Sequence, residues 1–532
     1  MTVTPQARTT PALVMAAERF GDRPAVVDER SMLTYDQLVL ASRRFGAALV
    51  AAGVEPGDRV AVWAPNGAEW IVAFLGLAQA GAALVPVNTR FKGAEAADVL
   101  RRSRARALVT VSRFLGADYV AMLRLSGASL PDLHTIVVAG GGAPDGALDW
   151  DEFLSRPGDE HHCQLDRRRA AVAESDVSDI LFTSGTTGAP KGVVQTHGRT
   201  LQVAGDWVEM TGLGPEDRYL MVNPYFHMFG LKAGILASLV SGATMLPEAV
   251  FDVDRILSRV ESERITVLPG PPTLYQALLD HPGRAGADLS SLRVAVTGAA
   301  DIPVELIRRL HAEMPFSLVV TGYGLTEAGT ATSTAPGDDV ETIAQTVGRP
   351  RPDFELRLVD EHGADVPGGR SGEILLRGAS VMSHYLDDPE STAAAFVDGG
   401  WLRTGDLGVR DAAGNLRIVG RTKDMFIVGG FNAYPAEIEN MLLEHPAIRQ
   451  AAVIGVPDER LGEVGMAFLV TADPARAPSE PEVIAWCRHR MANYKVPRRV
   501  ELVAALPLNA TGKVAKDDLR ALAASGQVTG AR

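Results

Sequence analysis

The most informative segment of this chain reads Phe182-Thr-Ser-Gly-Thr-Thr-Gly-Ala-Pro-Lys-Gly192. Its glycines permit positive φ angles and close backbone approach, so several N–H groups can converge on an anion. Hydroxyl side chains add hydrogen-bond donors, and Lys191 adds a mobile positive charge. The spacing differs from a Walker A loop because Gly188 is followed by Ala-Pro-Lys-Gly. The segment predicts a polyphosphate-binding loop, with a flexible turn as the alternative interpretation.

The first 175 residues alternate helix-like and strand-like stretches. Helices are predicted over Leu33–Gly53 and Glu69–Ala80, and strands over Arg59–Ala64 and Ala83–Pro86. Such alternation is typical of βαβ units and a mostly parallel sheet. In the middle third, an apolar strand is followed three times by a glycine- or hydroxyl-rich turn and then a helix. These turns are predicted at Ser184–Gly192, Gly298–Ala300 and Thr321–Glu327. They are candidate site loops, since ligands bind at the carboxyl ends of parallel strands.

The composition and the predicted secondary structure change further along the chain. The polar stretch over residues 155–178 is predicted to connect two parts of the fold. From about residue 345, short strands separated by turns indicate a β-rich subdomain, and mixed helix and strand patterns return after Arg421. We therefore predict an α/β protein. A large N-terminal domain (1–420) contains βαβ-type sheets and a small β-barrel subdomain, and a small mobile α+β domain spans 421–532.

Composition excludes several classes of protein. The 532 residues carry 52 Lys+Arg against 65 Asp+Glu, a net charge of −13. An acidic chain is a poor binder of nucleic-acid backbones. Two cysteines cannot form a disulfide framework, which favours a reducing compartment, the cytoplasm. No apolar run approaches the ~20 residues of a membrane span, and the N-terminus lacks a secretory signal pattern. A homodimer is compatible with these features.

The segment Phe182–Gly192 resembles the phosphate loop of the ANL superfamily of acyl-CoA synthetases, nonribosomal adenylation domains and luciferases. The resemblance runs from Ala80–Asn88 to Asn509–Lys513, with several motifs in the family order. It implies the substrates ATP and CoA, the cofactor Mg²⁺ and a small-molecule carboxylic acid. It also implies an ATP- and AMP-binding set consisting of Thr183, Ser184, Gly185, Thr186, Thr187, Gly188, Lys191, Gly298, Ala299, Ala300, Gly322, Tyr323, Gly324, Asp406 and Arg421.

Individual roles follow from the resemblance, each beside a plainer alternative. Tyr323 is expected to stack on adenine, Thr326 to contact the α-phosphate and Glu327 to bind Mg²⁺. Asp406 is expected to accept the ribose hydroxyls, and Arg421 to contact ribose or phosphate. Taken alone, a tyrosine such as Tyr323 is more often part of a core, and an aspartate such as Asp406 part of a surface turn.

Further roles are implied for the C-terminal part and for one histidine. Lys513 is expected to bridge carboxylate and α-phosphate during adenylation, because two anionic reactants must meet there. Lys423 matches the hinge, and His227 is expected to position the acyl group beside the thiol tunnel. The pantetheine arm of CoA is expected to pass along Gly429, Gly430 and Phe431. Without the resemblance, a solvated lysine, a packed histidine and a Gly-Gly turn would explain these residues.

The resemblance implies an AMP-forming acid:CoA ligase. Stretches such as Asp176–Gly188, Arg264–Pro282 and Leu289–Ala300 resemble actinobacterial ligases that act on the indanedione propanoate of steroid breakdown. The sequence departs from that pattern around His227 and in the acyl-pocket segments, so a medium-chain fatty acid or an aryl acid stays open. Two other classes also stay open: a freestanding adenylation enzyme that loads a carrier-protein thiol, and an oxygenase of luciferase type. A nucleotide-binding protein without catalysis is disfavoured, because Lys513 and Glu327 are both present.

Overall fold

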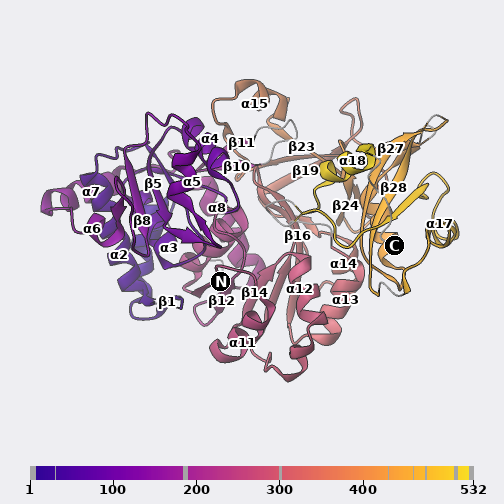
Figure 1. The fold of residues 1–532 in the computed structure, drawn as a ribbon, viewed down its shortest axis with the longest axis horizontal. Coiled ribbons are helices and arrows are strands. Elements are labelled where there is room, and N and C mark those ends of the chain that lie inside the picture. Colours follow the sequence, from indigo (N-terminus) through magenta and orange to yellow (C-terminus); the bar gives the residue numbers. More distant parts are fainter. Residues whose placement is uncertain are drawn as a thin grey trace. The chain divides into compact units, whose positions relative to one another are not determined.

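The computed structural model describes residues 7–29, 31–183, 190–298, 302–428, 431–458, 460–473, 476–508 and 513–525. Two compact units make up the chain, and they are interleaved in sequence. The first contains Met1–Thr297, Glu313–Ala331 and Gly378–Phe396. The second contains Gly298–Ala312, Thr332–Arg377 and Val397–Arg532. The fold is α/β, and many of its strands and helices are labelled in Figure 1.

An eight-stranded sheet carries the glycine-rich segment. Its order is β21-β11-β10-β4-β3-β5-β8-β9. The central pairs β10–β4, β4–β3, β3–β5 and β5–β8 are parallel, as the alternating pattern predicts. The strands are β3 (Arg59–Trp63), β4 (Ala83–Pro86), β5 (Ala105–Val111), β8 (Thr135–Ala139), β9 (Leu148–Asp149), β10 (Val177–Thr183), β11 (Lys191–Thr196) and β21 (His384–Tyr385). A two-stranded ribbon lies beside them in sequence, formed by β6 (Arg113–Phe114) and β7 (Ala117–Asp118).

A nine-stranded sheet has the order β18-β17-β16-β15-β14-β12-β13-β1-β2. Its strands are β1 (Pro24–Val27), β2 (Met32–Thr34), β12 (Arg218–Met221), β13 (Thr244–Pro247), β14 (Val267–Gly270), β15 (Val294–Thr297), β16 (Leu318–Leu325), β17 (Gly329–Ser333) and β18 (Arg349–Pro350). The strands β13, β14 and β15 are buried at every position. Continuous apolar strands of this kind need helices over both faces.

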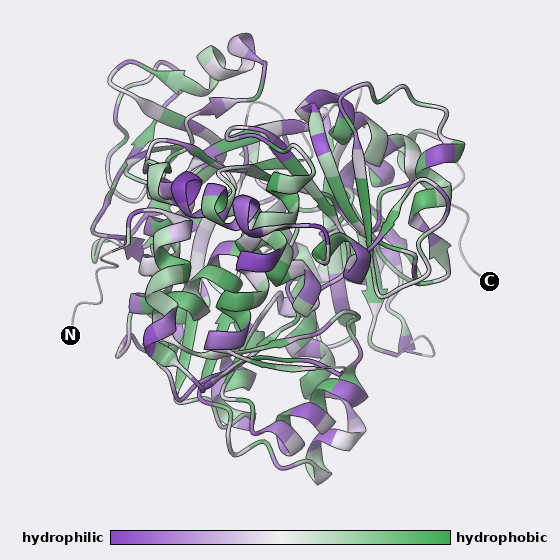
Figure 2. Ribbon diagram, turned by 90° about the vertical axis from the view of Figure 1, so that its left-hand side faces the viewer, coloured by the Kyte–Doolittle hydropathy of each residue, from purple (hydrophilic) through white to green (hydrophobic). Residues whose placement is uncertain are grey.

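The helices of the first unit supply that cover. Helix α2 begins at a capping box, in which Thr34 and Gln37 each bind the other's backbone N–H. Helix α3 is buried nearly all round, as its uninterrupted apolar sequence predicts. Figure 2 shows the hydrophobic colouring concentrated on sheet strands and inward helix faces. The helices are α1 (Thr10–Ala16), η1 (Ala17–Phe20), α2 (Tyr35–Ala51), α3 (Ala68–Gln79), α4 (Gly93–Ser103), α5 (Tyr119–Leu125), α6 (Trp150–Leu154), α7 (Asp159–Ala171), α8 (His197–Thr211), α9 (Met228–Gly230), η2 (Leu231–Leu236), α10 (Ala237–Ser241), α11 (Val253–Glu263), α12 (Pro272–Asp280), η3 (Pro282–Gly286) and α15 (Pro389–Ala395).

The second unit holds two smaller sheets. The β-rich region takes the form of a five-stranded sheet, β19-β20-β23-β22 with β24 paired to β23. The last sheet has the order β26-β25-β28-β27, with β29 paired to β28. The elements are α13 (Val304–Glu313), α14 (Val340–Gln345), β19 (Phe354–Val359), β20 (Ser371–Gly378), β22 (Phe396–Val397), β23 (Trp401–Arg410), β24 (Leu416–Arg421), β25 (Phe426–Val428), β26 (Phe431–Ala433), α16 (Pro435–Leu443), β27 (Ile448–Asp458), β28 (Gly462–Thr471), α17 (Glu480–Arg488), β29 (Arg499–Leu502) and α18 (Lys516–Ser525).

Two sequence expectations were wrong. The glycine-rich loop is followed by a strand, not a helix, because β11 pairs back on β10 as a hairpin. The predicted turn from Thr321 begins later, since β16 continues to Leu325. The polar stretch at 155–178, expected to connect two parts of the fold, contains helix α7, and the Arg43–Asp166 ion pair joins this helix to α2. Helix α7 was not predicted because its sequence is highly charged. The extension of β16 was not predicted because that segment contains glycines.

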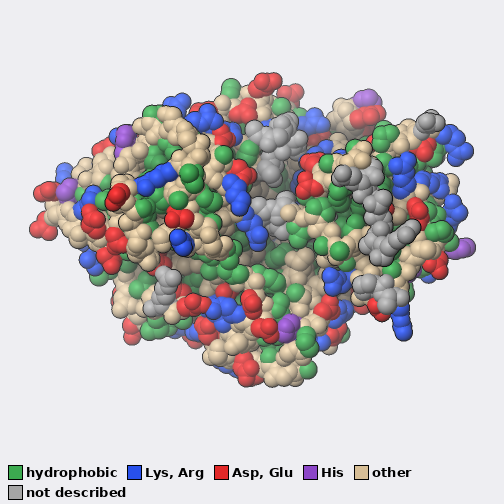
Figure 3. All heavy atoms as spheres, viewed as in Figure 1, with side chains coloured by type: hydrophobic (Ala, Val, Ile, Leu, Met, Phe, Trp, Pro, Cys, Tyr) green, Lys and Arg blue, Asp and Glu red, His purple; other side chains and the backbone are tan. Residues whose placement is uncertain are grey.

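The surface carries charges of both signs. Acidic and basic side chains are interspersed over the face shown in Figure 3. Within the described ranges, no helix combines the length and the apolar character that a bilayer crossing requires. Cys163 is exposed, Cys487 is buried, and neither forms a disulfide.

Candidate active site

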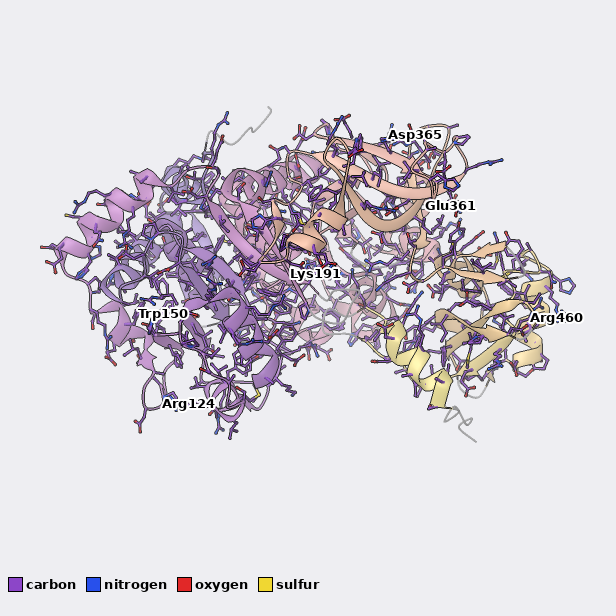
Figure 4. The ribbon with its side chains drawn as sticks, turned by 90° about the horizontal axis from the view of Figure 1, so that it is seen from above. Arg124, Trp150, Lys191, Glu361, Asp365 and Arg460 are labelled. Atoms are coloured by element: carbon purple, nitrogen blue, oxygen red, sulfur yellow. The ribbon has the colours of Figure 1, made fainter. Side chains whose placement is uncertain are left out.

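The ends of the glycine-rich loop are held together by strand pairing. Thr183, the last residue of β10, lies opposite Lys191, the first residue of β11, and its hydroxyl lies 3.4 Å from the Lys191 carbonyl oxygen. Figure 4 labels Lys191 at this end of the hairpin. Ser184, Gly185, Thr186, Thr187 and Gly188 lie outside the described residues. The register therefore brings together the two residues that flank the predicted phosphate loop.

A second group of predicted residues follows β15 and β16. These strands run parallel with Thr297 opposite Thr321, so both end at the same edge of the sheet. Gly322, Tyr323 and Gly324 are still part of β16, and Tyr323 is half-buried. A side chain at Gly324 would place its Cβ 2.3 Å from the Gly329 carbonyl oxygen, so the close approach of backbone requires glycine. Gly298 is buried, whereas Ala299 and Ala300 lie outside the described residues.

Thr326 and Glu327 form the turn that leaves β16. Their backbone carbonyl oxygens are bound by residues from other parts of the first unit: Gln195 Nε2 lies 3.5 Å from the Thr326 oxygen, and the Met382 amide donates to the Glu327 oxygen at 2.6 Å. Both side chains are half-buried. The turn is thus anchored through its backbone.

One residue that the sequence analysis missed contacts two predicted site residues. The hydroxyl of Tyr385 donates to Glu327 Oε1 at 3.0 Å. The same ring lies under Lys191, whose Nζ is 5.1 Å from the ring centroid. Burial, followed by the Glu327 carboxylate, raises the pKa of Tyr385 above its ordinary value, so the phenol stays protonated and donates. Tyr385 lies in the segment 380–386, which contains no glycine-rich motif, so no local signal singles it out.

Asp406 and Arg421 lie together in the second unit. They are direct partners across the antiparallel pair β23–β24, and Arg421 Nε is 3.0 Å from Asp406 Oδ1. The aspartate side chain is 8 % exposed and that of the arginine 50 %. Asp406 therefore belongs to a strand and not to a surface turn. The pair places one carboxylate and one guanidinium side by side. The carboxylate can accept hydrogen bonds from ribose hydroxyls, and the guanidinium can bind a nearby phosphate.

The remaining predicted residues are spread over other elements. His227 precedes α9, and its Nδ1 accepts a hydrogen bond from the Phe229 amide at 3.2 Å. Lys423 is exposed in the turn between β24 and β25. Lys513 is half-buried, and the next residue, Val514, forms an isolated antiparallel β-bridge with Leu508. Gly429 and Gly430 lie outside the described residues, and the backbone of Phe431 begins β26.

The donor set is suited to a magnesium ion held largely by its substrate. Within the described ranges, no group of three or more His, Cys, Asp or Glu side chains converges as a metal cage. Mg²⁺ is commonly bound by one or two carboxylates together with substrate phosphates. Glu327, close to the tip of the β10–β11 hairpin through Tyr385, is the carboxylate that fits this pattern.

Comparisons with known proteins agree on one family. Residues 13–386 match the family described as AMP-binding enzyme, and residues 437–513 match the AMP-binding enzyme C-terminal domain. The chain is similar to two proteins named 3-[(3aS,4S,7aS)-7a-methyl-1,5-dioxo-octahydro-1H-inden-4-yl]propanoyl:CoA ligase. The one from Mycobacterium tuberculosis is 51 % identical and the one from Rhodococcus jostii 48 %, each match covering 97 % of this chain and 99 % of the relative. A crystal structure of an anthranilate CoA ligase with anthranoyl-AMP superposes with a TM-score of 0.89 at 30 % identity, covering 99 % of this chain and 100 % of that one.

Proposed function

Because this chain belongs to the AMP-binding enzyme family and is an AMP-forming acyl-CoA ligase, we propose that its acid is the steroid-derived 3-(7a-methyl-1,5-dioxo-octahydroindenyl)propanoate. The observation that carries this proposal is the identity of 48–51 % to two ligases named for that substrate, over nearly the full length of each chain. The reaction consumes ATP and CoA and yields AMP, pyrophosphate and the thioester.

In the first step, we propose that a carboxylate oxygen of the acid attacks the α-phosphorus of ATP. The bond from that phosphorus to the bridging oxygen breaks, and pyrophosphate leaves with the electron pair. In this step Lys513 would lie between carboxylate and α-phosphate, where its charge offsets their repulsion. Thr326 contacts the α-phosphate, while Lys191 and the loop Thr183–Gly188 hold the other phosphates. When Mg²⁺ is bound at Glu327, it neutralises phosphate charge.

The nucleotide would be held by residues of several of these motifs. Tyr323 offers an aromatic face to adenine, Gly322 and Gly324 let the backbone approach it, and residues 298–300 close the other side. Asp406 accepts the ribose hydroxyls, and Arg421 lies beside it, with its Nε 3.0 Å from Asp406 Oδ1.

In the second step, the CoA thiol attacks the acyl carbonyl, its proton is lost and AMP leaves as the anion. We propose that the C-terminal domain, from residue 421 onward, turns about Lys423 between the steps. The turn withdraws Lys513 and presents Gly429, Gly430 and Phe431 to the pantetheine arm. His227 stands between acyl pocket and thiol. Exposure of Lys423 in a turn between two strands supports its use as a pivot. ATP and CoA are both available in the cytoplasm, where we place the reaction.

The substrate is tested with a panel of acids, each supplied with ATP, Mg²⁺ and CoA. The panel contains the indanedione propanoate, medium-chain fatty acids and aryl acids, including anthranilate. We expect the highest kcat/KM for the indanedione propanoate, measured as pyrophosphate and thioester released. A higher value for an aryl or fatty acid would overturn the proposed substrate and leave the ligase activity intact. A carrier-protein thiol that outcompetes CoA would replace the proposed acceptor.

The division of labour between the steps is tested with Lys513→Ala. We expect this change to abolish adenylate formation from acid and ATP, because it removes the charge proposed to offset the repulsion between carboxylate and α-phosphate. Conversion of supplied acyl-adenylate and CoA to thioester should fall far less. Pyrophosphate release and thioester formation are measured separately, with the exposed Lys92→Ala as a matched control. Equal losses in both half-reactions would contradict the assignment.

A further inference from the structure

Tyr385 contacts a predicted metal-binding carboxylate and a predicted phosphate-binding lysine at once. Its hydroxyl donates to Glu327 Oε1 at 3.0 Å, and its ring centroid lies 5.1 Å from Lys191 Nζ. We propose that Tyr385 is a positioning residue for adenylation: the hydroxyl orients the Glu327 carboxylate toward Mg²⁺, and the ring holds the Lys191 ammonium toward the ATP phosphates. This inference rests on the proposed roles of Glu327 and Lys191.

Strand register explains how Tyr385 reaches Lys191. The short strand β21 pairs antiparallel with β11, and Tyr385 lies directly opposite Val193. Side chains two residues apart on a strand point to the same face, so Lys191 is the diagonal neighbour of Tyr385. Two backbone hydrogen bonds fix this register, from Ser383 to the Val194 oxygen at 3.0 Å and from Leu386 to the Gly192 oxygen at 2.7 Å.

A second set of hydrogen bonds ties the same segment to the Glu327 turn. The Met382 amide donates to the Glu327 carbonyl oxygen at 2.6 Å, and the Ser380 hydroxyl donates to the Ala328 carbonyl oxygen at 2.9 Å. The amide of Gln195, on β11, lies 3.3 Å from the Ser380 carbonyl oxygen. The segment 380–386 therefore joins β11 to the turn after β16. Tyr385 is the residue in it whose side chain contacts both predicted ligand-binding groups.

The chemistry of a tyrosine suits both contacts. A neutral hydroxyl can fix one carboxylate oxygen without cancelling the charge that a cation needs, as a lysine or arginine would. Hydrogen-bond partners of metal-binding carboxylates orient them, and their loss typically costs about 10- to 100-fold in metal affinity or activity. Loss of a cation–π contact at an exposed site costs about 0.5–1 kcal/mol, which is about a two- to fivefold change in binding. Such a contact restrains the Lys191 ammonium and leaves its N–H groups able to bind phosphate oxygens.

The two contacts are separated by two substitutions. Tyr385→Phe keeps the ring and removes the hydroxyl, whereas Tyr385→Leu removes both. Calorimetry measures ATP binding to each variant without acid, once in EDTA and once over a range of Mg²⁺ concentrations. For Tyr385→Phe, we expect unchanged metal-free ATP binding and an about tenfold rise in the Mg²⁺ concentration at half-saturation. For Tyr385→Leu, we also expect metal-free ATP binding to weaken about two- to fivefold.

A matched control is Tyr119→Phe, which removes a hydroxyl that donates to the Thr89 carbonyl oxygen at 2.6 Å in the same unit. It should leave both binding constants unchanged. Normal Mg²⁺ dependence in Tyr385→Phe, or equal loss with and without Mg²⁺, would overturn the role of the hydroxyl. Unchanged metal-free binding in Tyr385→Leu would overturn the role of the ring. If Tyr385→Leu does not fold, the tyrosine-to-phenylalanine comparison still decides the first role.

Reference variants separate this inference from the proposed function. Glu327→Gln should raise the Mg²⁺ requirement and Lys191→Met should weaken metal-free ATP binding, if their proposed roles hold. Should those variants behave as expected while both Tyr385 variants bind like the wild type, only the positioning role fails. Should the reference variants themselves bind normally, the proposed roles of Glu327 and Lys191 fail.

Discussion

At the scale of single residues, His197 shows how burial sets a pH limit. It begins α8, is 1 % exposed and makes a 3.0 Å contact from Nδ1 to the Thr10 hydroxyl. Burial lowers the pKa of His197 to about 4, against the opposing pull of Asp179 and Asp176. In the unfolded chain, where the pKa of His197 is 6.5, the imidazole therefore binds a proton at a pH at which the folded protein keeps it neutral.

The sign of the effect follows from linkage. The contribution of His197 is fully present above pH 6.5 and is lost as the pH falls toward 4. Its size is about 3 kcal/mol across that window. We expect His197→Gln to flatten the decrease in melting temperature between pH 7 and pH 5, measured by calorimetry. His362→Gln, at a side chain 81 % exposed, is the control and should keep the wild-type slope. An unchanged slope in His197→Gln would refute the assignment.

At the scale of elements, a buried ion pair joins β10 to the π-helix η2. Lys232 Nζ lies 3.0 Å from Asp179 Oδ1, and the two side chains are 1 % and 0 % exposed. Thr200, on α8, donates to the other carboxylate oxygen at 2.5 Å. Strand β10 runs into the glycine-rich loop, and η2 follows the His227 turn, so the pair fixes two site-bearing elements against each other.

Breaking one half of the pair should be costly. Lys232→Met leaves the Asp179 charge buried without compensation, and we expect a loss of about 3–5 kcal/mol in unfolding free energy. The double variant Lys232→Met/Asp179→Asn removes both charges and should recover much of that loss. Denaturant unfolding measures both. Arg284→Met, which breaks the more exposed Arg284–Glu313 pair, is the control and should cost below about 1 kcal/mol. A double variant no more stable than Lys232→Met would contradict the charge argument.

At the scale of the whole molecule, the C-terminal residues have a core of their own. A single hydrophobic cluster runs from Phe426 to Leu519 and includes Phe468 and Leu469 of the long strand β28. We expect a fragment of residues 421–532 to fold alone, with a cooperative thermal transition by circular dichroism and dispersed amide resonances. A fragment of residues 332–532, which adds the β-rich sheet, is the comparison. If only the longer fragment folds, the proposed domain boundary near residue 421 is wrong.

Much of the fold was predictable because its signals are local. The apolar runs at Arg59–Trp63 and Ala83–Pro86 are strands close to where the pattern puts them. Helix α7 was missed because its sequence is charged on most faces and the helix is held by tertiary contacts such as Arg43–Asp166. The strand β11 was missed because hairpin pairing with β10 outweighs the local glycine signal.

The amino-acid sequence alone determined the family, the reaction class and the residue types available for phosphate, ribose and metal, because short motifs carry that chemistry in fixed order. Tertiary structure decided which residues lie together: Asp406 against Arg421 through strand register, and Tyr385, which belongs to none of those motifs, against both Lys191 and Glu327. The physical reason is distance along the chain. Tyr385 is separated from Glu327 by 58 residues, and the pairing of β21 with β11, together with the hydrogen bonds of Ser380 and Met382 to the turn after β16, brings its ring to Lys191 and Glu327.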